Sequence, residues 1–342
     1  MNGHRNTMPT TGRRALLGAT LAAPLLLPGA ARAQAFPDRP FPDRPFPDRP
    51  VRIVVAFSPG GEPDILMRAM APALQAALGQ PVVIDNRPGA TTIIAAEHVA
   101  QARPDGYTLL MTSSTTFAVT PHLFRRLPFR IEQFQPVTLL MRAQLALYAN
   151  PRLGLRNVAD VIARARTAQH PMKYATTNRG AVAHLSGERM KQVAGIALED
   201  VTYRGSADAA QALIRGDVDI GFDGLATYLG LVRNGDIQAL AVTGDRRIPA
   251  LPNVPTFDEE GFPDMAQGYW YGLFAPAGIP EAVLARINDA VRQASAATAL
   301  GEQMTTIGAR LQQNSPAEFA AMIAQERDVW GQLIRRIGLT LD

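Results

Sequence analysis

The chain has 342 residues, of which 47% are hydrophobic, 19% are charged and none is cysteine. This length and hydrophobic content allow a large core, most naturally two α/β domains or one large one, so a disordered chain is not the default expectation. The lack of cysteine excludes disulfides, thiol chemistry and lipid attachment at a cysteine.

The basic character of the chain comes from its N-terminus. The formal net charge is +4, but the first 35 residues hold four arginines and no acid, which leaves 30 basic and 30 acidic residues in the remainder. A near-neutral mature chain lacks the broad basic surface of a nucleic-acid-binding protein. We therefore expect no nucleic-acid partner.

Residues 1–35 are predicted to be a cleaved export signal. Basic residues up to Arg14 precede an apolar stretch from Ala15 to Leu27, and small residues offer cleavage after Ala33 or Ala35. The arginine pair that ends at Arg14 resembles a twin-arginine signal, and an ordinary charged leader of the general secretory route is the alternative. Because the apolar stretch is too short to span a membrane, we expect a freely soluble periplasmic protein that is not membrane-anchored.

Residues 36–50 repeat the pentamer Phe-Pro-Asp-Arg-Pro three times. Fifteen residues are too few for a solenoid, and proline at the second and fifth positions of each pentamer favours an extended chain. We interpret the segment as a Pro-rich leader without function, of which only the last copy, running into Val51, needs to be ordered.

The first candidate site is the stretch Arg52–Asp64, with the sequence RIVVAFSPGGEPD. The apolar run Ile53–Phe57 predicts a buried strand, Ser58–Gly61 a tight loop, and the apolar residues that recur from Ile65 a helix. Two glycines let the backbone turn with its amides outward, and the helix adds the positive end of its dipole. The loop is thus predicted to bind an anion; the alternative is a tight connection with no ligand.

Short strands and helices alternate along the remaining chain. Strands are predicted over residues 81–84, 107–111, 136–140, 145–149, 173–176, 201–203, 219–222, 237–243 and 269–275, and helices over 93–101, 158–168, 181–194, 207–214, 280–297 and 316–337. This alternation predicts an α/β protein with two doubly wound domains and a ligand cleft between them. Residues 51–142 with 269–342 are predicted to form domain 1, and residues 143–268 domain 2.

Polar residues follow several of these strands. A hydroxyl cluster, Ser113, Ser114, Thr115 and Thr116, ends a strand at the position where ligands bind in open α/β sheets, with a helix cap as the alternative role. The polar loop at residues 177–180 precedes a helix and repeats the architecture of the first candidate site. Further polar loops or strand ends are Tyr203, Arg204, Gly205 and Asp223.

Several stretches resemble the extracytoplasmic solute receptors of tripartite tricarboxylate transporters, also called Bug receptors. The matching pieces are FPDRPVRIVV at 46–55, PGGEPD at 59–64, GQPVVIDNRPGA at 79–90, RPDGYTLL at 103–110, KYAT at 173–176, HL at 184–185, GE at 187–188, YRG at 203–205, GDVD at 216–219, LPNVPT at 251–256 and WYGL at 270–273. Their order and spacing are specific, and the resemblance covers Phe46 to Gly338. The chain departs from the family pattern at Ala56, at Pro63, and along 89–95 and 176–181.

The resemblance implies a type II periplasmic-binding-protein-like fold that closes on a carboxylate-bearing solute and delivers it to the integral-membrane permease of a tripartite transporter. It also implies that the loop Phe57–Asp64 and the helix start Thr176–His184 hold a ligand carboxylate, partly through ordered water. The solutes it suggests are a di- or tricarboxylate, an acidic amino acid or an aromatic acid. We expect a monomer that is not an enzyme and has no cofactor.

The predicted ligand-binding residues combine the residue patterns with the resemblance. They are Phe57, Ser58, Pro59, Gly60, Gly61, Asp64, Ser113, Ser114, Thr176, Thr177, Asn178, Arg179, Gly180, Ala181, His184, Tyr203, Arg204, Gly205 and Asp223. At least one of Arg179 and Arg204 is expected to face the distal polar group of the ligand, because an unpaired anionic end in a closed cleft is costly.

Three alternatives stay open. His184 and Glu188 are four residues apart on a predicted helix, as paired metal ligands are, but a capping or hydrogen-bonding role for His184 is favoured and no metal is expected. The sequence has neither a nucleophile elbow nor a P-loop, yet an exported α/β enzyme acting on a carboxylated substrate is the alternative function. A receptor that serves an ABC transporter or a sensor kinase is the third alternative.

Overall fold

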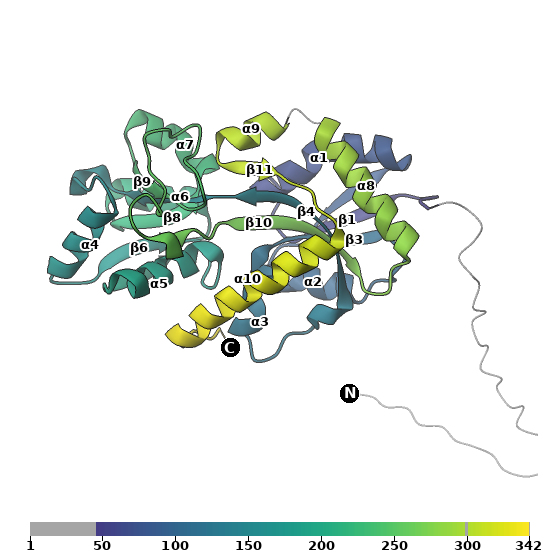
Figure 1. Cartoon of the computed structure of the whole chain (residues 1–342), viewed down its shortest axis with the longest axis horizontal. Helices are drawn as coiled ribbons and strands as arrows, with labels where there is room; N and C mark the ends of the chain where they lie inside the picture. Colours follow the sequence, from purple (N-terminus) through teal and green to yellow (C-terminus); the bar gives the residue numbers. More distant parts are fainter. Residues whose placement is uncertain (1–45, 298–299, 342) are drawn as a thin grey trace, which may run out of the picture. The chain divides into compact units, whose positions relative to one another are not determined.

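Two mixed β-sheets organise the residues that the computed structural model describes, 46–297 and 300–341. The strand order is β11-β4-β10-β3-β1-β2 in the first sheet and β7-β6-β8-β5-β9 in the second. Helices cover both sheets (Figure 1), and the predicted α/β fold with two lobes is confirmed. The predicted export signal, 1–35, and the first two copies of the repeat, 36–45, lie outside the described residues.

The first sheet contains the strands that follow the N-terminal segment. Its strands are β1 (Val51–Val55), β2 (Val82–Asn86), β3 (Thr108–Ser113), β4 (Phe134–Ala143), β10 (Tyr269–Pro276) and β11 (Ala309–Leu311), and its helices are α1 (Glu62–Leu78), α2 (Ile93–Ala100), α3 (Thr120–Leu123), α8 (Glu281–Ala297), α9 (Leu300–Thr306) and α10 (Pro316–Ile337). β1 is parallel to its neighbours β2 and β3, whereas β10 is antiparallel to β3 and β4. Parallel strands are covered on both faces, so β1 is almost wholly apolar and buried.

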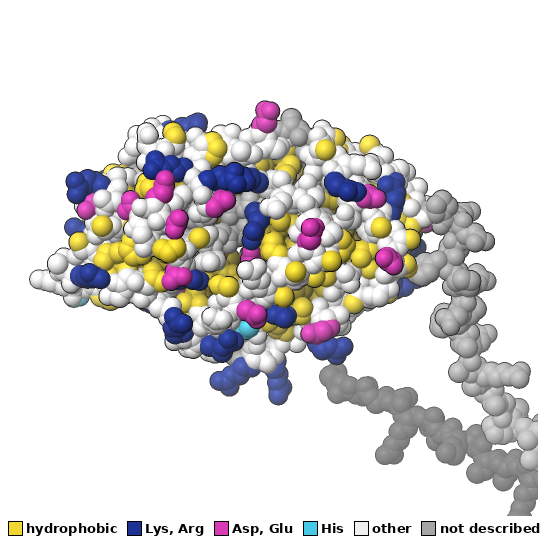
Figure 2. Space-filling view, viewed as in Figure 1, with side chains coloured by type: hydrophobic (Ala, Val, Ile, Leu, Met, Phe, Trp, Pro, Cys, Tyr) yellow, Lys and Arg dark blue, Asp and Glu magenta, His cyan; other side chains and the backbone are white. Residues whose placement is uncertain are grey.

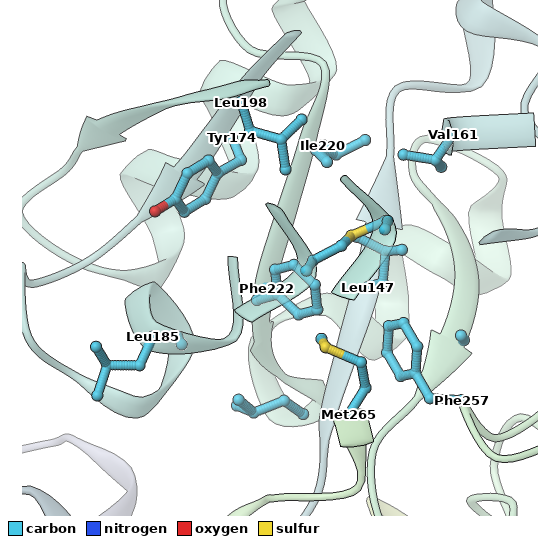
Figure 3. Close-up of a cluster of buried hydrophobic side chains, with 14 of the residues drawn as sticks. Leu147, Val161, Tyr174, Leu185, Leu198, Ile220, Phe222, Phe257 and Met265 are labelled. Carbon is cyan, nitrogen blue, oxygen red and sulfur yellow. The ribbon is translucent and has the colours of Figure 1, made fainter. Parts of the chain in front are cut away.

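The second sheet is built by the middle of the chain. Its strands are β5 (Leu145–Ala149), β6 (Met172–Thr176), β7 (Leu198–Thr202), β8 (Ile220–Gly224) and β9 (Gln238–Val242), and its helices are α4 (Val158–Thr167), α5 (Val182–Ala194), α6 (Ser206–Arg215) and α7 (Leu225–Asn234). Side chains alternate across β5, so Leu147 joins one buried cluster and Tyr148 the other. Figure 3 shows the first of these clusters, where Leu147, Ile220 and Phe222 lie together.

Most predicted elements are found within a few residues of their expected bounds. Gly79 ends α1 in a left-handed conformation with φ 75°, as expected for a C-cap, and Asn157 caps α4 through its side chain. Thr92 precedes α2 but does not cap it with its side chain, because its hydroxyl bonds to Thr116. The helices α3, α7 and α9 and the strand β11 were not predicted from the sequence. The helix α7 starts directly after Gly224, which offers no side-chain cap.

Two chain crossings connect the sheets. Only Gln144 separates β4 from β5, and the chain returns through Gly268 into β10. The crossings touch closely, because a Cβ atom on Gly268 would lie 2.1 Å from the carbonyl oxygen of Ala143. An apolar contact also joins the sheets, since Trp330 and Leu333 of α10 are buried in the cluster of Figure 3.

The surface agrees with the charge balance of the sequence. Basic and acidic side chains are intermixed over most of the face shown in Figure 2. Among the helices of the described residues, none is both long enough and apolar enough to span a bilayer.

Candidate functional site

A cavity of about 730 Å³ lies where parallel strands of both sheets end. Its lining comes from the residues that follow β1, β3, β6, β7 and β8, together with Tyr269 and Tyr271 of β10. Ligands of open α/β sheets bind outside the carboxyl ends of the strands, and this volume is typical of a small-molecule site.

Four helices begin at this cavity: α1, α5, α6 and α7. Their N-cap residues are Gly61, Ala181, Gly205 and Gly224, and all four line the cavity. None of these four residues caps its helix with a side chain. The first amides of a helix have no acceptor within the helix, and they add to the positive end of its dipole. The cavity is therefore suited to bind an anion such as a carboxylate.

The loop before α1 is held by Asp64, which does not line the cavity. The Gly60 amide donates to Asp64 Oδ2 at 2.8 Å, and Arg68 and Asn86 donate to the same carboxylate at 2.9 Å. Burial disfavours the charged form of Asp64 and would raise its pKa. The hydrogen bonds outweigh this effect, so the pKa of Asp64 is lowered. Asp64 thus shapes the loop before α1.

The loop before α5 is held by His184, which is 1% exposed and also outside the lining. The Gly180 amide donates to His184 Nδ1 at 3.2 Å. Burial is the main cause that lowers the pKa of His184, so the ring is neutral at pH 7. Because Nδ1 accepts a hydrogen bond, the proton of the neutral ring is on Nε2.

Within the described part of the chain, His184, Glu188 and Asp200 form a group whose ligand atoms lie within 4.8 Å of one another. Asp200 is the third member of this group, and the sequence did not reveal it. Both carboxylates are already paired, Asp200 with Arg179 at 3.2 Å and Glu188 with Lys191 at 2.9 Å. A metal ion would also need the lone pair on His184 Nε2, where the Gly180 bond places the proton. The contacts therefore support a structural role for this group.

Two acids in the cavity have altered acidity. Burial raises the pKa of Glu62, although the Tyr269 and Tyr271 hydroxyls donate to its Oε2 at 2.7 and 3.1 Å. Burial likewise raises the pKa of Asp223 to about 6, against hydrogen bonds from Ser206, the Gly224 amide and Tyr228. The charge of Glu62 raises the pKa of Asp223 further, which indicates that the two carboxylates act on each other.

The structure brings most of the predicted site residues together. Those that line the cavity are Phe57, Ser58, Gly60, Gly61, Ser113, Thr177, Asn178, Ala181, Arg204, Gly205 and Asp223. Those outside the lining are Pro59, Asp64, Ser114, Thr176, Arg179, Gly180, His184 and Tyr203. Of the two candidate arginines, Arg204 lines the cavity, whereas Arg179 pairs with Asp200.

Several lining residues were not predicted. They include Glu62, Ser206, Thr227, Tyr269 and Tyr271. Two signals were available in the sequence. Glu62 and Ser206 directly follow the glycines that precede predicted helices, and Tyr269 and Tyr271 alternate along a predicted strand, which places both on one face.

Comparison with known proteins shows that this chain is similar to a family of receptors. Residues 66–339 match the family described as the Tripartite tricarboxylate transporter family receptor. The structure of the periplasmic binding protein BugD is similar, with 28% identity, a TM-score of 0.76 and coverage of 86% of this chain and 99% of that one.

Two similar structures from Rhodopseudomonas palustris contain a ligand. Rpa4515, solved with adipate, is 31% identical, with a TM-score of 0.78 and coverage of 86% of this chain and 99% of that one. MatC, solved with bound malate, is 30% identical, with a TM-score of 0.75 and coverage of 84% of this chain and 100% of that one.

Proposed function

The chain belongs to the tripartite tricarboxylate transporter receptor family of periplasmic solute-binding proteins, and from this we propose that it binds a small carboxylate-bearing solute in the cavity and delivers it to the permease of a tripartite transporter. The members of this family with similar structures are binding receptors and not enzymes. Adipate in Rpa4515 and malate in MatC support a carboxylate as the solute class.

The observation that carries this proposal is the meeting of four helix starts at one cavity. Gly61, Ala181, Gly205 and Gly224 leave the first amides of their helices without side-chain caps. A carboxylate between them would accept hydrogen bonds from the first amides and would be favoured by the dipoles. Because α1 belongs to the first sheet and α5, α6 and α7 to the second, such a ligand would contact both lobes and favour their closure.

The proposal also includes the predicted domains, the oligomeric state and the export signal. Residues 51–142 with 269–342 would move as one domain and residues 143–268 as the other. The receptor would act as a monomer, with residues 1–35 as its export signal of the twin-arginine or general secretory type.

The substitution Gly61→Val tests the cavity as the binding site. The backbone at Gly61 is extended, with φ −73°, so a β-branched residue can adopt it without strain, but its Cβ would lie 3.3 Å from the Ser58 carbonyl and its methyl groups would cover the α1 amides. Thermal shift with a panel of di- and tricarboxylates, amino acids and aromatic acids identifies the best probe, which at about a hundredfold over its Kd should stabilise the wild type by about 2.7 kcal/mol.

We expect Gly61→Val to lose this stabilisation while its far-UV circular dichroism stays unchanged. Gly230→Val is the matched control, because Gly230 has open space around it and does not line the cavity. If Gly61→Val bound the probe as tightly as the wild type, the α1 loop would be only a tight connection and the ligand would bind elsewhere.

A further inference from the structure

The charges that line the cavity are not those of a simple anion site. Three charged side chains line it within the described residues: Glu62, Asp223 and Arg204. Two negative side chains thus face the cavity against one positive side chain, and Arg204 is exposed, so its charge is screened by solvent.

Glu62 is fixed in place at the first position of α1. The hydroxyl groups of Tyr269 and Tyr271 both donate to Glu62 Oε2, and their rings pack against each other with centroids 5.5 Å apart. Burial raises the pKa of both tyrosines well above its usual value, so they stay protonated donors. Their protons satisfy one carboxylate oxygen without neutralising the charge of Glu62.

Asp223 is equally fixed at the end of β8. The Gly224 amide donates to its Oδ1 at 2.8 Å, and the hydroxyl groups of Ser206 and Tyr228 are further partners. No arginine or lysine is among these partners. Glu62 and Asp223 repel each other across the cavity, and a carboxylate of the solute beside them would add a third negative charge.

A protonated amine in this place would have the opposite effect. It would donate charge-assisted hydrogen bonds to both carboxylates and remove their repulsion. The helices α5 and α6 start on the same cavity, and beside them lie the polar side chains of Thr177, Asn178 and Arg204. These groups suit a carboxylate, so the lining offers one place for each charge of a zwitterion.

On the basis of the proposed function, we infer that the solute is a small aminocarboxylic acid, whose carboxylate binds at the starts of α5 and α6 and whose protonated amine binds between Glu62 and Asp223. Two observations carry this inference together. The cavity has the size of a solute site in a receptor fold, and its two half-buried acids have neutral partners in place of cations. The inference excludes a plain dicarboxylate as the preferred solute.

Four acids of five carbons test the inference by isothermal titration calorimetry at pH 7.5. Glutarate has two carboxylates, pentanoate has one, and norvaline and 5-aminopentanoate each combine one carboxylate with an amine at a different distance. We expect norvaline or 5-aminopentanoate to bind at least about tenfold more tightly than glutarate and pentanoate, since a charge-assisted hydrogen bond adds this much affinity.

Two substitutions remove the charges with little change in shape. Glu62→Gln and Asp223→Asn should each weaken binding of the preferred amine by at least about tenfold, and they should strengthen binding of glutarate. Asp208→Asn is the matched control, because Asp208 lies in the first turn of α6 but is exposed and outside the lining. It should leave all four affinities unchanged.

The outcomes separate this inference from the proposed function. If glutarate bound to the wild type as tightly as either amine, or if Glu62→Gln and Asp223→Asn left the amine affinity unchanged, the inference would be wrong and the carboxylate receptor would stand. If none of the four acids bound, the inference would be wrong, and the thermal-shift panel with Gly61→Val would decide separately whether the cavity binds another carboxylate.

Discussion

The loops before α1 and α5 have the same backbone design but different chemistry. Each has a glycine in the left-handed region, Gly60 with φ 79° and Gly180 with φ 83°. The next residue is the extended N-cap, Gly61 or Ala181, with φ and ψ of −73° and 162° or −70° and 160°. The amide of each left-handed glycine donates to the side chain four residues later, which is Asp64 before α1 and His184 before α5.

The difference lies in the charge of the acceptor. Asp64 is an anion near the start of α1, so it already compensates the dipole of that helix, and Arg68 compensates Asp64 in turn. His184 is neutral and leaves the positive end of α5 uncompensated. Two loops of equal shape therefore differ in their capacity for an anion, and α5 is the better partner for a solute carboxylate. This agrees with the place inferred for the amine, beside α1.

The largest loss of stability should come from Asp64→Ala, which removes the side chain that holds the loop before α1. The substitution leaves the Gly60 amide without its acceptor and removes the charged partner of Arg68 and Asn86. Loss of a buried charge with several hydrogen bonds should lower the free energy of unfolding by about 3 kcal/mol. Urea denaturation measures this loss. A loss below about 1 kcal/mol would mean that water replaces Asp64 and that the loop does not depend on it.

A smaller difference in stability is expected between alanine substitutions at the two left-handed glycines, Gly60 and Gly180. Gly60→Ala places a Cβ in open space, so only backbone strain of about 1 kcal/mol is expected. Gly180→Ala has the same strain, but its Cβ would lie 2.4 Å from Leu123 Cδ1 and 2.9 Å from Leu341 Cδ1, which should add about 1–3 kcal/mol. Thermal unfolding of both variants gives the comparison. Equal melting temperatures would show that the side chains of Leu123 and Leu341 both move aside freely.

The smallest effect is a dependence of stability on pH which, of the two loops compared, should affect only the loop before α5. The pKa of His184 is lower in the folded protein than the 6.5 of the free side chain, so the unfolded state binds more protons and stability falls as the pH drops below 6.5. The pKa of Asp64 is lowered from 3.8, so its stabilisation persists above pH 3.8 and is lost only below it. Between pH 7.5 and 5, only the α5 loop should weaken.

The variant His184→Asn isolates this dependence, because asparagine can accept from the Gly180 amide and does not titrate. The free energy of unfolding should fall less between pH 7.5 and 5 in the variant than in the wild type. The charged groups that face His184 are Glu188, Asp200, Arg179 and Lys191, and all are retained in the variant. Parallel pH profiles of the two proteins would contradict the assignment.

The sequence correctly predicted the features that depend on residues close to one another along the chain. The apolar run of β1 and the glycines after it predicted a strand, a loop and a helix start that line the cavity. The same reasoning could not tell that Asp64 and His184 turn back to their own loops, because either residue could also face a ligand. Side-chain direction there depends on the conformations of Gly60 and Gly180.

Contacts between distant segments were not predictable in this way. Tyr269 meets Glu62 although 207 positions separate them, because β10 returns beside β3 in the first sheet. The sequence predicted that β10 returns to the first half but not which of its side chains meet α1. The charge balance of the cavity, on which the nature of the solute depends, therefore became apparent only in the folded structure.

The close approach of Gly268 to Ala143 places the two crossings between the sheets in direct contact, where they could act as one hinge. If the lobes close as proposed, we expect the two crossings to bend together, because their backbones lie in close contact at Gly268 and Ala143. A side chain at position 268 would push the two crossings apart. It would thereby change the equilibrium between the open and closed conformations of the lobes. Since the apparent affinity scales with the population of the competent state, a single side-chain atom at position 268, outside the cavity lining, would change how tightly the proposed receptor holds its solute.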